Sequence, residues 1–241
     1  MDWRLPAIAL VALAAGAGAL IATGFWSPWA GRYVQGVDVS RHQPDIDWRA
    51  LARTDIRFAY IKATEGADYV DPLFAAHWRN AGAAGLKRGA YHFFTLCRTG
   101  AEQAANFLRT VPRGDALPPA VDLEHKGPCR HGAQISDVDG EVRAYLDAVE
   151  TATGRRPILY VTREFHDAHI AEFKGERFWV RSLFRWPQYR RRDWVLWQHH
   201  NKGARAGVKG PVDIDAFRGD ERAFAVFANN TRDVASNEAP P

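Results

Sequence analysis

Short apolar runs alternate along the chain with stretches in which apolar residues recur every three or four positions. Eight of the runs have the length and composition of buried strands: residues 34–39, 58–63, 89–94, 120–124, 158–161, 178–181, 195–199 and 212–214. Helical periods follow the first five runs, over residues 47–52, 72–84, 100–110, 137–153 and 164–173. Gly85 and Gly154 each follow a helical stretch, where glycine often ends a helix. The pattern predicts five strand–helix units and then three strands with shorter connections.

This alternation favours parallel βαβ units, and eight strands are enough to close a barrel. We therefore predict an α/β protein with a single TIM-like barrel of the type (β/α)5(β)3. In such barrels the functional residues gather at the C-terminal ends of the strands. Acidic and amide side chains fall at or near these ends, namely Asp38, Asp122, Glu124, Gln198, Asp213 and Asp215. Closure makes the first and eighth strands neighbours, so acids from the first, fourth and eighth strands are expected to meet in one cleft.

The densest chemical signal is the run Ala120-Val121-Asp122-Leu123-Glu124. Residues i and i+2 of a strand point to the same face, so Asp122 and Glu124 would project side by side, about 7 Å apart. Two acids beside a buried strand are costly unless they are paired or used. Glycoside hydrolysis uses such a pair. A solvated strand end or a salt-bridge acceptor is the alternative interpretation.

The two ends of the chain differ from its centre. Residues 5–26 are 22 uncharged, mostly apolar positions, which as a helix would span about 33 Å. We favour a membrane anchor over a cleaved signal peptide, and both alternatives export the rest of the chain. The polar composition of residues 229–241 predicts a disordered tail. The expected division is residues 1–30 as anchor or signal, 31–228 as catalytic barrel and 229–241 as tail.

Net charge, cysteine content and histidine spacing limit the binding partners, the cross-links and the cofactors that we expect. The net charge of +4 suits an anionic polymer or surface, and no nucleic-acid motif is present. In an oxidising compartment the two cysteines, Cys97 and Cys129, invite a disulfide, with two free thiols as the alternative. No histidine spacing is convincing for a metal site, so we expect no metal and no cofactor.

Six motifs in chain order carry a resemblance to a known family. They are Gly36-Val37-Asp38-Val39-Ser40, Tyr60-Ile61-Lys62-Ala63-Thr64-Glu65-Gly66, Gly89-Ala90-Tyr91-His92-Phe93-Phe94, Val121-Asp122-Leu123-Glu124, Trp197-Gln198 and Val212-Asp213-Ile214-Asp215. Together they resemble the glycoside hydrolase family 25 lysozymes, the Chalaropsis-type muramidases, over roughly residues 34–218. The resemblance implies a flattened barrel of five β/α units and three further strands, in agreement with the strand count. It also implies hydrolysis of the β-1,4 bond between N-acetylmuramic acid and N-acetylglucosamine in peptidoglycan.

The resemblance assigns roles to four carboxylates. It makes Glu124 the catalytic acid and Asp122 its partner, while Asp38 and Asp213 line the cleft. Crowding by the other acids favours the protonated state of Glu124 at rest. We expect Asp122 to orient the substrate's 2-acetamido group, whose carbonyl attacks the anomeric carbon with net retention; direct inversion is the alternative. A peptidoglycan-binding protein that kept the fold and lost turnover is the competing function.

Further residues are candidates for sugar contact. Tyr91, Tyr160 and Trp197 could stack on sugar rings, although packing of the barrel explains them equally well. Gln198 and Asp215 are candidates for hydrogen bonds to the substrate. The expected partner is the peptidoglycan glycan strand, with no nucleic acid. We expect a monomer that touches the membrane only through an uncleaved N-terminal helix.

Overall fold

A computed structural model describes residues 32–114, 116–125, 129, 134–190 and 193–229. Within these residues no helix has the length and apolar character needed to cross a bilayer. The predicted anchor or signal segment and most of the predicted tail lie outside the described residues.

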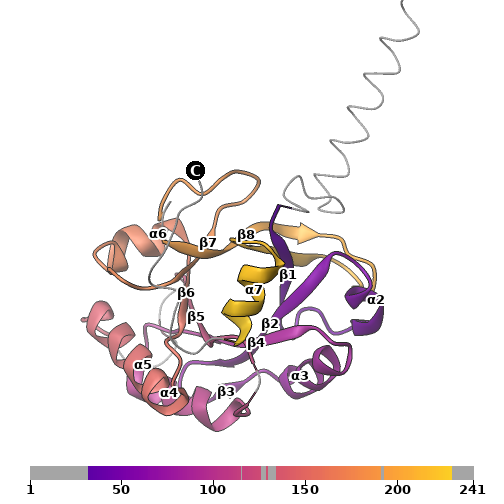
Figure 1. The fold of residues 1–241 in the computed structure, drawn as a ribbon. Helices are drawn as coiled ribbons and strands as arrows, with labels where there is room; N and C mark the ends of the chain where they lie inside the picture. Colours follow the sequence, from indigo (N-terminus) through magenta and orange to yellow (C-terminus); the bar gives the residue numbers. More distant parts are fainter. Residues whose placement is uncertain (1–31, 115, 126–128, 130–133, 191–192, 230–241) are drawn as a thin grey trace, which may run out of the picture.

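The described chain forms strands and helices in the predicted alternation (Figure 1). The strands are β1 (Val34–Val39), β2 (Ile56–Glu65), β3 (Tyr69–Val70), β4 (Lys87–Phe93), β5 (Ala120–Leu123), β6 (Ile158–Val161), β7 (Phe178–Arg181), β8 (Trp194–Gly203) and β9 (Val212–Phe217). The helices are α2 (Trp48–Ala52), α3 (Phe74–Ala83), α4 (Gly100–Thr110), α5 (Val138–Thr153), α6 (Arg163–Phe165), which continues into the π-helix η1 (His166–Ile170), and α7 (Glu221–Asn229).

Eight strands close a barrel, as predicted. The order is β1-β9-β8-β7-β6-β5-β4-β2, and a β1–β2 pairing completes the ring; β3 adds a short hairpin partner to β2. The ladders from β1 through β2, β4, β5, β6 and β7 to β8 are parallel. β9 runs antiparallel to both β8 and β1, a direction that the sequence pattern did not specify. As a result β9 begins at the end of the barrel where the other seven strands finish.

Two layers of apolar side chains hold the barrel together. The larger layer lies between the strands and the surrounding helices, and the smaller one fills the barrel interior. Alternation along β2 separates the two layers, because Phe58 and Tyr60 belong to the interior cluster while Ala59 and Ile61 belong to the outer one. Figure 1 shows α2, α3, α4 and α5 around the ring.

The ends of these helices follow local signals. Thr99 and Glu102 form a reciprocal capping box at the start of α4. Asp137 caps α5, which ends at Gly154 in a left-handed conformation that glycine adopts without strain.

Helix α7 is absent from the predicted elements. The sequence pattern led us to expect that the last part of the barrel had no helix, but α7 packs Phe224 and Phe227 into the interior cluster. The Phe224 ring lies 5.4 Å from that of Phe58 and 5.3 Å from that of Phe217. Figure 1 shows α7 across the middle of the ring. The helix therefore closes the end of the barrel at which β2 begins.

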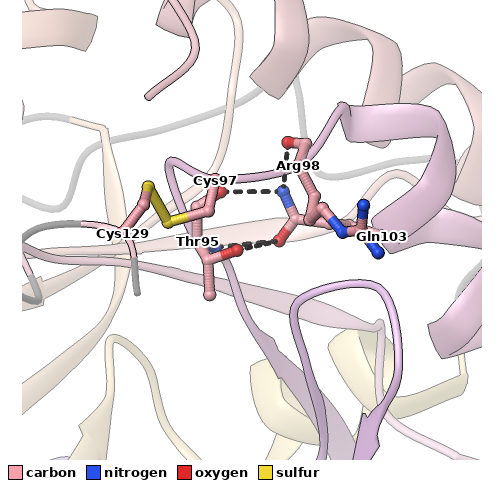
Figure 2. Close-up of a disulfide and its surroundings, with 5 residues drawn as sticks. All are labelled: Thr95, Cys97, Arg98, Gln103 and Cys129. Carbon is pink, nitrogen blue, oxygen red and sulfur yellow. Dashed lines mark hydrogen bonds between the residues drawn. A yellow bond between two sulfur atoms is a disulfide. The ribbon is translucent and has the colours of Figure 1, made fainter. Parts of the chain in front are cut away.

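The predicted disulfide between Cys97 and Cys129 is present (Figure 2). It joins the connection after β4 to the connection after β5. The buried Gln103 side chain secures the first connection, since its amide accepts from Thr95 N–H at 2.8 Å and donates to the carbonyls of Thr95 and Arg98 at 2.9 Å each. The cross-link therefore ties Cys129 to a connection that Gln103 supports.

Candidate active site

A cleft of about 520 Å³ opens at the C-terminal end of the parallel strands. It is lined mainly by polar and aromatic side chains. Among the described residues these are Asp38, Ser40, His42, Gln43, Lys62, Tyr91, Phe93, Asp122, Glu124, His125, Tyr160, Trp179, Arg181, Gln198, Asn201 and Asp213. The four carboxylates singled out in the sequence are among them.

Barrel closure brings these carboxylates together from three strands. Asp38 lies near the end of β1, and its Cα partner across the ladder is Asp213 near the start of β9. Asp122 lies on β5, and Glu124 follows directly after the strand. Both side chains reach the same cleft, as expected for positions i and i+2.

A chain of hydrogen bonds fixes Asp38. The Gln198 amide donates to Asp38 Oδ2 at 2.8 Å, and the Tyr160 hydroxyl donates to Gln198 Oε1 at 3.0 Å. The side chains of Asp213 and Asp215 lie close enough to Asp38 to influence its pKa as hydrogen-bonding neighbours. Two carboxyl groups share a hydrogen bond only when one of them holds a proton. Gln198 is therefore a support for Asp38 as well as part of the lining.

Burial keeps protons on this cluster at neutral pH. Desolvation raises the pKa of Asp38 to about 6, against hydrogen bonds from Gln198 and the neighbouring acids that lower it. The pKa of Asp213 rises to about 9, first through burial and then through the charge of Asp38. Burial and the same charge raise the pKa of Asp215 well above its usual range. The proton sharing belongs to the cluster as a unit.

Asp122 and Glu124 form a second coupled pair. Burial raises the pKa of Asp122 well above its usual range, and the adjacent Glu124 raises it further. Lys62 opposes this shift, but its ammonium is paired with Glu65 at 2.8 Å. Asp122 Oδ1 is buried and has no hydrogen-bond partner within the described residues. An unpartnered buried acceptor of this kind is available for a donor on a bound substrate.

The aromatic candidates separate into two groups. Tyr91 and Tyr160 line the cleft, whereas Trp197 does not. Trp197 is fully buried between the strands and the outer layer, and its indole N–H donates to Ser182 O at 2.8 Å. The cause is strand alternation, because Gln198 faces the cleft and its neighbour must face outward.

Asp215 lies beneath the cleft and not on its surface. The side chain is fully buried, and its Oδ1 accepts from the Trp179 indole N–H at 2.9 Å. Trp179 and Arg181 both line the cleft but were not among the predicted site residues. Their spacing on the strand at residues 178–181 was the available signal, because positions i and i+2 share a face.

The described part of the chain holds no group of three or more His, Cys, Asp or Glu side chains arranged to bind a metal ion.

Comparison with known proteins gives consistent matches. The model of the family described as glycosyl hydrolases family 25 matches residues 37–208. YegX from Escherichia coli K12 is 34% identical over 210 residues, which cover 83% of this chain and 75% of that protein. Lysozyme M1 from Streptomyces globisporus is 30% identical over 217 residues, which cover 82% of this chain and 72% of that protein. The structure of a family 25 glycosyl hydrolase from Bacillus anthracis superposes with a TM-score of 0.74 and 37% identity, covering 80% of this chain and 93% of that one.

Proposed function

Because this chain belongs to glycosyl hydrolase family 25 and is a glycoside hydrolase, we propose that it hydrolyses the β-1,4 bond between N-acetylmuramic acid and N-acetylglucosamine in peptidoglycan. Membership of a lysozyme family supports peptidoglycan as the substrate class. The observation that carries the finer proposal is the convergence of Asp38, Asp122, Glu124 and Asp213 on one cleft. A protein that only bound glycan would have no use for four crowded carboxylates.

Glu124 is the general acid of this proposal. It donates a proton to the glycosidic oxygen as the bond to the anomeric carbon breaks. Its position just after β5, at the mouth of the cleft and half-exposed, lets a sugar chain reach it. The neighbouring Asp122 lies on the same face and is more constrained by the strand.

Asp122 orients the 2-acetamido group of the substrate, which acts as the nucleophile. The carbonyl of the 2-acetamido group attacks the anomeric carbon, and Asp122 Oδ1 accepts the N–H of that group. The buried, unpartnered state of this oxygen supports the assignment. Water then opens the resulting oxazolinium-like intermediate and gives its proton to the Glu124 carboxylate, with overall retention of configuration. Initial release of the α-anomer, detected by NMR, is the result that would exclude retention.

Asp38 and Asp213 set the charge of the cleft and hydrogen-bond the sugar. The negative charge that remains on this cluster favours a protonated acid nearby, because like charges oppose each other's ionisation. Tyr91 and Tyr160 offer ring faces to the glycan, and Gln198 acts through Asp38.

The enzyme acts outside the cytoplasmic membrane in this proposal. The apolar residues 5–26 would anchor or export residues 31–228, which form the catalytic unit. Peptidoglycan is the partner that this arrangement gives access to.

A digest of defined peptidoglycan, analysed by mass spectrometry of the reducing ends, tests the proposed function. Muramic acid at the new reducing ends is the expected result. N-acetylglucosamine at the reducing ends would contradict the bond assignment. Absence of any cleavage would contradict the proposed muramidase activity.

A further inference from the structure

Arg181 places a positive charge in a cleft whose other lining groups include four carboxyl groups. It is the last residue of β7, it is half-buried, and it lines the cleft together with Trp179 on the same face of the strand. The catalytic scheme above does not use it. Among the described residues that line the cleft, the other Lys or Arg side chain is that of Lys62.

The backbone of Arg181 is held firmly from the outer side of the barrel. Its N–H donates to the Tyr189 hydroxyl at 3.2 Å, and its carbonyl lies 3.0 Å from the same hydroxyl. The Tyr189 hydroxyl also lies 2.7 Å from Val161 O on the neighbouring strand. These contacts engage the main chain and leave the guanidinium to reach into the cleft.

The two cations of the cleft differ in their carboxylate partners. Within the described part of the chain Arg181 forms no ion pair, in contrast to Lys62, which Glu65 neutralises at 2.8 Å. Its charge does act on Asp213, where it lowers the pKa against the larger effects of burial and Asp38. Because burial keeps protons on the cluster that contains Asp213 at neutral pH, this carboxyl is not a full counter-charge for the guanidinium. A planar guanidinium without an ion-pair partner can donate two parallel hydrogen bonds to the carboxylate of a ligand.

The proposed substrate carries such a ligand. N-acetylmuramic acid differs from N-acetylglucosamine by a lactyl ether that ends in a carboxyl group. In the wall this carboxyl is either free or joined by an amide to a stem peptide with carboxylates of its own. We propose that Arg181 is a specificity-determining residue that binds a carboxylate borne by the muramic acid unit, either lactyl or stem-peptide. This inference rests on the proposed function and names the chemical group of the glycan that the cleft would recognise.

The test compares KM for four glycans: stem-bearing peptidoglycan, stem-free glycan with free lactyl groups, and each of these with its carboxyls converted to amides. Arg181→Gln keeps a polar side chain and removes the charge. We expect KM on the charged glycans to rise about tenfold, which corresponds to about 1.4 kcal/mol. On the amidated glycans we expect less than about a twofold change, because no charge is left to bind. Arg181→Lys, which keeps the charge without the fork, should fall between the wild type and Arg181→Gln.

Arg222→Gln is the matched control, because it removes the same charge from the exposed face of α7 at the other end of the barrel. A rise in KM confined to stem-bearing glycan identifies the stem carboxylates, and a rise on stem-free glycan identifies the lactyl group. An equal change on charged and amidated glycans would overturn the proposal, since a purely structural or electrostatic role affects all substrates alike.

Co-sedimentation with insoluble wall, natural or amidated, keeps this inference separate from the proposed function. If the wild type cleaves none of the glycans, the proposed function fails. Binding that prefers the natural wall and loses this preference in Arg181→Gln still supports the carboxylate site. Equal binding of both walls by the wild type contradicts it.

Discussion

At the scale of single residues, the carboxylates of the cleft differ in their surroundings although they share one chemistry. Glu124 is half-exposed at the end of a strand, whereas Asp122 has a buried oxygen without a partner and Asp38 is held by Gln198. These differences support the proposed division into a proton donor, a group that positions the substrate and a group that tunes charge. Each role therefore predicts its own mutational result.

Glu124→Gln should lower the turnover rate by about 10²-fold or more, because general acid catalysis commonly supplies that factor. The amide keeps the shape of the side chain and cannot donate the proton to the leaving group. Release of soluble muropeptides from purified wall measures the rate. Glu172→Gln, an exposed change outside the cleft, is the control and should match the wild type. Near-wild-type turnover in Glu124→Gln would show that another group is the acid.

Asp213→Asn should stabilise the protein at alkaline pH and have little effect near pH 4. The pKa of Asp213 is raised from 3.8 to about 9 on folding, so the folded state binds this proton more tightly than the unfolded state. Stability linked to this group is present below about pH 4 and is lost as the pH rises toward 9. The asparagine stays neutral and avoids this loss.

Thermal unfolding at pH 4, 6 and 9 measures this effect, with the exposed Asp68→Asn as control. A midpoint for Asp213→Asn that stays below that of the wild type at pH 9 would contradict the raised pKa.

At the scale of elements, the strands supply most of the described residues that line the cleft, and a disulfide and a buried glutamine support the connections that follow β4 and β5. The disulfide ties Cys97, in the connection after β4, to Cys129, in the connection after β5 (Figure 2). Gln103 in α4 supports the first of these connections from within. The disulfide and Gln103 therefore both engage the connection after β4.

Replacing both Cys97 and Cys129 by serine should lower the free energy of unfolding. The two cysteines are 32 residues apart, and closing a loop of this size is worth about 3–4 kcal/mol in the chain-entropy model. In a protein of this size that loss corresponds to a fall of about 10 °C in Tm. Calorimetry of the double variant measures it, and the wild type in reductant should show a similar fall. Equal Tm values with and without the bond would show that it contributes no stability.

At the scale of the whole molecule, the barrel has one open end that carries the cleft and one end closed by α7. Phe224 and Phe227 of α7 complete the interior cluster, so the last helix belongs to the folded unit. The proposed catalytic unit, residues 31–228, thus needs Asn229 to include all of α7.

A chain of residues 31–229 should fold and cleave peptidoglycan in solution at a rate within about threefold of the full chain, since α7 completes the interior packing. A chain that stops at Gly219 should be strongly destabilised, because the loss of a buried phenylalanine costs about 3–5 kcal/mol and two are removed. Circular dichroism melting and wall digestion distinguish the two chains. Failure of the longer chain to fold would show that the proposed domain boundaries are wrong.

The sequence by itself determined the barrel, its eight strands and the acids at the ends of the first and fourth predicted strands. Strand alternation and helix-ending glycines are local signals, and β1, β6 and β7 were predicted with the bounds that the structure has. The D-x-E motif placed Asp122 and Glu124 on one face for the same reason. The resemblance to the family 25 lysozymes, carried by six motifs, is confirmed by the family match.

Only the tertiary structure decided which way β9 runs, what closes the barrel and which side chains face the cleft. The reversal of β9 is what sets Asp213 beside Asp38, and no periodicity encodes a strand's direction. The buried position of Asp215 depends on strands distant in sequence, because this residue pairs with Gly36 of β1 and its Oδ1 accepts from the Trp179 indole N–H on β7. Burial and charge coupling, which set the protonation of these acids, arise only once those strands meet.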